Sequence, residues 1–84
     1  MNYREDIEDG TVILEPEWMD NAIIGHAYVN DVQVLVYSYY ALVRTIMRNY
    51  GTDSEGAREC IEYNTIPSLQ FMGDKAPIIV YVNQ

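Results

Sequence analysis

The sequence predicts a small single domain of the α+β class, in which a β-hairpin is followed by two helices and a C-terminal strand (β-β-α-α-β). Two β-rich runs at 22–29 and 32–37, a helical apolar stripe at 39–50 and a dense apolar run at 78–82 indicate this order. We expect a three-stranded, mainly antiparallel sheet with the helices on one face. A chain of 84 residues is too short for a second independent core.

The chain begins with a polar stretch. Residues 1–10 end at a glycine and predict an acidic mobile arm, which leaves residues 11–84 as the single domain. A short apolar run from Val12 to Leu14 stops before Pro16, which cannot donate to a sheet ladder. We therefore expect an edge strand or an extended arm here, with Trp18 packed against the domain.

The first two strands are expected to form a hairpin. Asn30 and Asp31 separate them, and both residue types tolerate the left-handed backbone of a tight turn. Gly25 weakens a strand interior, so its position predicts a bulge or a close neighbour.

The first helix carries the clearest periodicity in the chain. Six apolar or aromatic side chains fall on one helical stripe: Tyr39, Leu42, Val43, Ile46, Met47 and Tyr50. Ser38 is placed to cap the first turn, and Gly51 suits the left-handed residue that ends a helix. Tyr40 lies off the stripe and is expected to be partly exposed.

A second helix is expected directly afterwards. Thr52 and Glu55 have the spacing of a capping box. The inward positions would be Ala57, Cys60, Ile61 and Asn64. Because Pro67 disfavours helical geometry in the residue before it, the sequence predicts that this helix ends near Asn64 or Thr65.

Acidic residues are concentrated at the front of the chain. The first 20 residues hold seven acids against Arg4: Glu5, Asp6, Glu8, Asp9, Glu15, Glu17 and Asp20. Of the net charge of −8, about −6 lies in this stretch. The electric field of these acids favours a partner with a basic surface. Direct binding of nucleic acid needs clustered basic residues, and because Lys75 is the only lysine, we do not expect it. The alternative is that these acids only aid solubility.

No arrangement for catalysis, cofactor binding or metal binding is predicted, so we do not expect an enzyme. The sole histidine, His26, has no partner at a meaningful spacing, and Cys60 falls on an inward helix face as a small apolar filler. A single cysteine excludes an internal disulfide and favours a cytoplasmic protein. The longest apolar runs are too short for a membrane span, and the acidic start does not resemble a signal peptide.

The segment "VYSYYALVRTIMRNYGTDSEGARECIEYNTIPSLQFMGDKAPIIVY" resembles a group of small bacteriophage and prophage proteins. The likeness covers residues 34–81 and is most distinctive in the Glu62–Ile66 block and in residues 76–79 of the Gly-x-x-x-Pro-Ile-Ile strand. The sequence departs from the group at Pro67 and Gln70, and residues 1–20 fall outside the likeness. The resemblance implies a phage origin, and hence the cytoplasm of a host cell, but no particular chemistry.

Eight tyrosines beside thirteen acids indicate a protein-binding surface. Phage inhibitors such as anti-CRISPR proteins are similar in design. Our hypothesis is an acidic binding protein that inhibits a host nucleic-acid-handling defence protein, such as a Cas effector, by steric or nucleic-acid-mimic blocking. The predicted partner-binding residues are the seven acids above with Trp18 and Tyr40. A phage structural or accessory protein acting through self-assembly, for instance as a homodimer, is the alternative.

Overall fold

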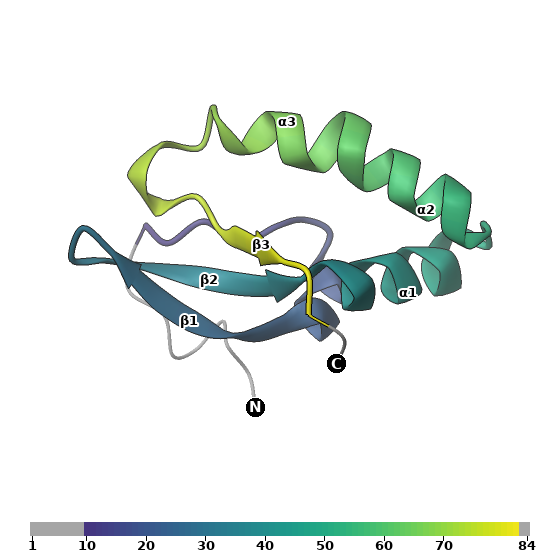
Figure 1. The fold of residues 1–84 in the computed structure, drawn as a ribbon, viewed down its shortest axis with the longest axis horizontal. Helices are drawn as coiled ribbons and strands as arrows, with labels where there is room; N and C mark the ends of the chain where they lie inside the picture. Colours follow the sequence, from purple (N-terminus) through teal and green to yellow (C-terminus); the bar gives the residue numbers. More distant parts are fainter. Residues whose placement is uncertain (1–9, 83–84) are drawn as a thin grey trace.

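The computed structural model describes residues 10–82 (Figure 1). All but the last residue of the predicted mobile arm therefore lies outside the described residues. The elements follow in this order: 3-10 helix η1 (Glu17–Ala22), β1 (Ile23–Val29), β2 (Val32–Ser38), α1 (Tyr39–Tyr50), α2 (Ser54–Cys60), π-helical turn η2 (Ile61–Thr65), α3 (Ile66–Leu69), 3-10 helix η3 (Gly73–Lys75) and β3 (Ile78–Val80). The predicted α+β class and β-β-α-α-β order are confirmed.

The three strands form one mixed sheet in the order β1-β2-β3. The long pair β1 and β2 is antiparallel, whereas the short β3 runs parallel to β2, with Val36 opposite Ile78 and Ser38 opposite Val80. Parallel pairing requires a crossover, and the helices between the two strands provide it. In Figure 1, the rod formed by α2, η2 and α3 spans the top of the molecule above the strands, and α1 continues beyond the end of β2.

The hairpin forms at the predicted turn. Asn30 and Asp31 both have positive φ, 52° and 67°, which is the backbone twist that a two-residue hairpin turn requires. The bulge predicted at Gly25 is also present, because the strand register shifts between Ile23 and Gly25.

Helix α1 begins and ends where its sequence predicts. The Ser38 hydroxyl accepts a hydrogen bond from the Ala41 amide at 3.2 Å, and Gly51 closes the helix with φ of 66°. The stripe is buried through Ile46, but Tyr50 at the last turn is exposed, because the core ends before the helix does. Tyr40 is partly exposed, as expected.

Three predictions about the second helix are wrong: its cap, its end and the inward position of Asn64. Asp53, not Thr52, caps it: the Asp53 carboxylate accepts from the Gly56 amide at 2.8 Å, because Asp53 is the extended residue that directly precedes the first turn. The helix also does not end near Thr65. The chain remains helical through η2 and continues as α3 to Leu69.

The π turn explains how the helical path passes Pro67. The Ile66 amide donates to the Ile61 carbonyl, five residues back, which widens the helix at this point. Pro67 then lies in the first turn of α3, where a residue without an amide hydrogen is tolerated. Of the predicted inward residues, Ala57 and Ile61 are buried and Cys60 is half-buried, whereas Asn64 is exposed because the π turn rotates it outward.

The core lies where α1, the helical rod and the sheet meet. Its fully buried large side chains include Leu35 and Tyr37 from β2, Leu42 and Ile46 from α1, and Ile61 from η2. Each such side chain stabilises the fold by about 1.5–3 kcal/mol through burial, before chain entropy is subtracted. These contacts hold in place the N-terminal segment and the rod, which together form the candidate site.

Candidate protein-interaction site

Residues 11–16 form an extended arm that is tied to the middle of the sheet. Leu14 is buried in the core, and its amide donates to the hydroxyl of Tyr37 at 2.9 Å. Farther out, the Val12 amide donates to the Lys75 carbonyl at 3.4 Å. Of the two forms predicted for this stretch, the structure has the extended arm and no strand, and this arm places Glu15 at the surface directly beyond a buried anchor.

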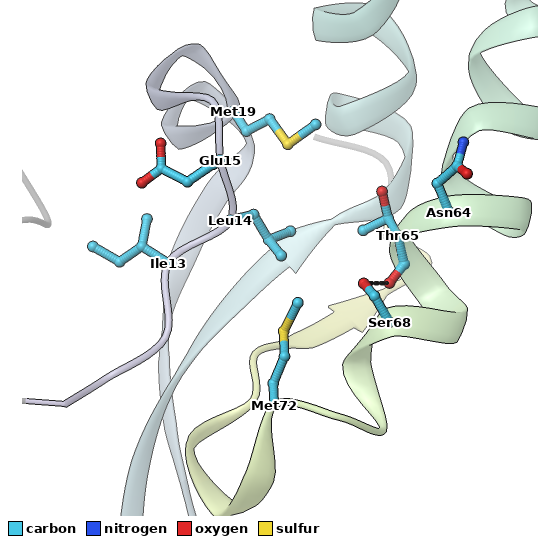
Figure 2. A pocket seen from close by; sticks show the side chains of 8 residues that line it. All are labelled: Ile13, Leu14, Glu15, Met19, Asn64, Thr65, Ser68 and Met72. Atoms are coloured by element: carbon cyan, nitrogen blue, oxygen red, sulfur yellow. Dashed lines mark hydrogen bonds between the residues drawn. The ribbon is translucent and has the colours of Figure 1, made fainter.

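A hollow of about 320 Å³ lies between this arm, η1 and the rod (Figure 2). Its lining residues are Ile13, Leu14, Glu15, Met19, Asn64, Thr65, Ser68 and Met72. Leu14, Met19 and Met72 supply its apolar surface. Figure 2 shows the Glu15 side chain directed away from the helical wall, so its carboxylate lies on the other side of the arm from Asn64, Thr65 and Ser68.

The opposite wall of the hollow is polar and comes from the π turn and α3. Asn64 and Thr65 belong to the Glu62–Ile66 block, and Ser68 follows one turn later. The Ser68 hydroxyl donates to the Thr65 carbonyl at 2.7 Å, which ties this side chain to the helix backbone (Figure 2). π turns are rare and are often found at functional sites, so the π turn in this wall supports the choice of the hollow as the candidate site.

Of the described acids of the predicted partner-binding set, Glu15 lines the hollow, whereas Glu17 and Asp20 lie on η1, which contributes Met19 to it. Glu15 and Glu17 are exposed and Asp20 is half-exposed, on the arm and on η1. Trp18 packs against the core, as expected, and meets Tyr50 edge to face with ring centroids 5.3 Å apart. The other four predicted acids lie outside the described residues: Glu5, Asp6, Glu8 and Asp9.

Tyr40 does not join this group. It lies at the opposite end of α1 from Tyr50, about 15 Å along the helix axis at 1.5 Å per residue. Its ring instead contacts Tyr39, with centroids 5.5 Å apart, and Tyr81, with centroids 6.5 Å apart. Tyr81 was not predicted as a site residue, because only the parallel pairing of β3 with β2 brings it to this place.

The residues weighed for catalysis have ordinary surroundings. His26 is exposed on β1 and meets Tyr28 edge to face, and Cys60 is half-buried against the core. Within residues 10–82, no three metal-binding side chains gather into a potential ion site, and no helix has the length and apolar character needed to cross a membrane. Comparison with protein-family models, with curated proteins and with solved structures gives no match for this chain.

Proposed function

We propose that the chain is a phage-encoded acidic binding protein that inhibits a host nucleic-acid-handling defence protein by covering its basic surface. The observation that supports this best is the exposure of Glu15 and Glu17 on a segment anchored by the buried Leu14, next to a hollow with one apolar and one polar wall. Exposed negative charge and nearby apolar surface are together complementary to a partner surface rich in lysine and arginine.

The hollow suits a lysine or arginine of the partner. These side chains combine an aliphatic stem with a charged head, and the stem would pack against the adaptable thioether of Met72, which is half-buried. The Glu15 and Glu17 carboxylates, which are exposed on the arm and on η1, would attract other basic side chains of the same partner surface. Trp18 and Tyr50 add aromatic contact area of the type enriched in protein interfaces.

The same contacts would prevent the partner protein from binding nucleic acid. A surface that binds phosphates does so with lysine and arginine, and an acidic protein seated there occupies the same cations. The inhibitor needs neither a cofactor nor a chemical step for this effect. Its action would be stoichiometric, and it would weaken as salt screens the charges.

The test compares two double variants with the same net charge. Basic proteins captured from host lysate are identified, and their binding to the pure protein and their displacement from nucleic acid are measured at roughly 50 and 300 mM salt. We expect Glu15→Gln with Glu17→Gln to weaken binding about tenfold at low salt, and Asp31→Asn with Asp74→Asn, two exposed acids elsewhere, to change it little. Equal effects of the two pairs, or binding that ignores salt, would contradict the proposal.

Self-assembly is the second candidate, and exposed aromatic side chains favour it. Phe71 is 82% exposed and Tyr63 is 74% exposed, both on or next to the helical rod. Light scattering at micromolar concentration distinguishes the two functions. A stable oligomer that becomes monomeric on Phe71→Ser would support assembly, whereas a monomer supports capture of another protein.

A further inference from the structure

Three tyrosines form a contiguous aromatic group at the start of α1, which we call the tyrosine platform: Tyr39, Tyr40 and Tyr81. The Tyr39 and Tyr81 rings lie 4.5 Å apart at 33°, and the Tyr40 and Tyr81 rings lie 6.5 Å apart at 79°. Tyr39 is buried, but Tyr40 is 37% exposed and Tyr81 is 60% exposed. Two accessible rings therefore stand almost at right angles to each other.

The platform is held in place by Ser38, which is fully buried. Its hydroxyl accepts from the Ala41 amide and donates to the Val82 carbonyl at 2.9 Å. Val80 pairs with Ser38 in the sheet, so the backbone is fixed on both sides of Tyr81. A rigid aromatic site loses less entropy on binding than a mobile one.

Negative charge adjoins the platform. The Tyr39 hydroxyl donates to the Glu62 carboxylate at 3.1 Å, and Glu62 is exposed on the rod. The positive charge of Arg58, which precedes Glu62 by four residues in the helical rod, lowers the pKa of Tyr39 and so opposes the effect of the Glu62 carboxylate. Aromatic faces with a carboxylate at their edge attract cations, and arginine combines charge with a flat face that stacks on tyrosine.

We propose that the tyrosine platform binds an arginine side chain of the basic protein partner, with the guanidinium against Tyr40 and Tyr81 and its charge facing Glu62. The inference rests on the proposed function and extends it, because it adds a second contact at the far end of α1 from Trp18. The net charge of −8 and the single lysine favour a basic protein over a nucleobase as the occupant.

The test uses a small probe, so that it does not depend on the partner. N-acetyl-arginine methylamide is titrated into the labelled protein, with the uncharged N-acetyl-norleucine methylamide as the matched probe, and amide and tyrosine ring signals are followed by NMR. We expect the arginine probe to shift the signals of Tyr40, Tyr81 and Glu62, and the norleucine probe to leave them in place. Equal shifts with both probes would overturn the proposal, as would the same shifts with a single-stranded oligonucleotide and none with arginine.

Variants of exposed residues complete the test without disturbing the core. Tyr81→Leu should weaken probe binding about fivefold, Tyr81→Phe should retain it, and Arg58→Gln should strengthen it. Tyr28→Leu, an equally exposed tyrosine on β1, is the control and should bind as the parent protein does. Unchanged binding by Tyr81→Leu would refute the platform. Glu15→Gln with Glu17→Gln should not alter probe binding. The probe therefore tests the tyrosine platform alone, and a negative result would leave the proposed role of Glu15 and Glu17 in partner binding untouched.

Discussion

Ser38 is the residue on which the most separate parts of the fold depend. It ends β2, caps α1 and holds the chain beyond β3 through the Val82 carbonyl. We expect Ser38→Ala to lower the free energy of unfolding by about 2 kcal/mol, because it removes a helix cap and a buried hydrogen bond together. Urea unfolding measures this. The control is Ser54→Ala at an exposed position that caps nothing, where a change within about 0.5 kcal/mol is expected; equal losses in the two variants would contradict the assigned role.

Tyr39 makes stability depend on pH in the alkaline range. Burial raises the pKa of its hydroxyl above 10.0, and the hydrogen bond to Glu62 and the charge of that carboxylate raise the pKa further. The folded protein therefore holds this proton at a pH where the unfolded chain has lost it. The contribution of Tyr39 to stability is complete below about pH 10 and declines as pH rises from there through the folded pKa.

The comparison with Tyr39→Phe isolates this effect from the other groups that titrate above pH 9. Urea midpoints measured from neutral pH to pH 11 should fall more steeply for the parent protein than for the variant. Two parallel curves would show that the Tyr39 pKa is the same in the folded and unfolded states.

At the scale of elements, α1 was predictable because its signals are local. The apolar stripe, the Ser38 cap and Gly51 all lie within 14 consecutive residues, and each acts on the backbone next to it. The hairpin was predictable for the same reason, since Asn30 and Asp31 alone supply the turn. Local chemistry thus determined the type and the limits of these elements.

Elements that depend on distant contacts were predicted less well. Pro67 is a helix breaker in its local sequence, yet the π turn before it lets the rod continue to Leu69 over the core. The 3-10 helix η1 was missed, since residues 17–22 carry no helical period and take this form where they pack on α1. The parallel direction of β3 likewise follows from the path of the helices, which no short stretch encodes.

The same distinction applies to the candidate site. Glu15, Glu17 and Trp18 were predicted individually from charge and residue type, and they stay predictions. The hollow beside them was not, because its walls come from the arm near Leu14 and from the rod near Thr65, some 50 positions apart in the sequence. Tyr81 was missed because its ring partners are brought to it by the pairing of β3 with β2.

The end of α1 offers a test of backbone conformation alone. Gly51 has φ of 66°, and a Cβ added there would meet nothing within 4 Å, so any cost of substitution comes from the backbone and not from a clash. We expect Gly51→Ala to destabilise the fold by about 1 kcal/mol. Gly51→Asn should cost less, because asparagine tolerates the left-handed region. Thermal unfolding of both variants measures the difference, and equal costs would show that some other factor ends the helix.

At the scale of the whole molecule, the charge is uneven and the two proposed contact regions lie apart. About three quarters of the net charge belongs to the first 20 residues, whereas the tyrosine platform lies at the start of α1. Long-range attraction mainly speeds encounter, and close contacts mainly slow dissociation. The front-end acids should therefore govern the association rate, and the hollow and the platform should govern the lifetime of the complex.

Neutralising the first four acids tests this division of roles. Glu5→Gln, Asp6→Asn, Glu8→Gln and Asp9→Asn together change the net charge from −8 to −4, since each removes one negative charge. We expect the variant to associate with the basic partner about tenfold more slowly than the parent protein at low salt, with little change in the dissociation rate. At high salt, where the charges are screened, the association rates of variant and parent should become equal. Stopped-flow mixing measures both rates.

The matched control removes the same charge from exposed acids elsewhere: Asp31→Asn, Glu55→Gln, Glu59→Gln and Asp74→Asn. If net charge alone steers the encounter, the two quadruple variants slow association equally, and the front of the chain has no special role. If the placement of charge determines the association rate, the control variant keeps most of the association rate of the parent protein, because its substitutions lie outside the first 20 residues, where the acids are concentrated. A faster dissociation of the front-end variant at unchanged association rate would instead make these acids part of the contact itself.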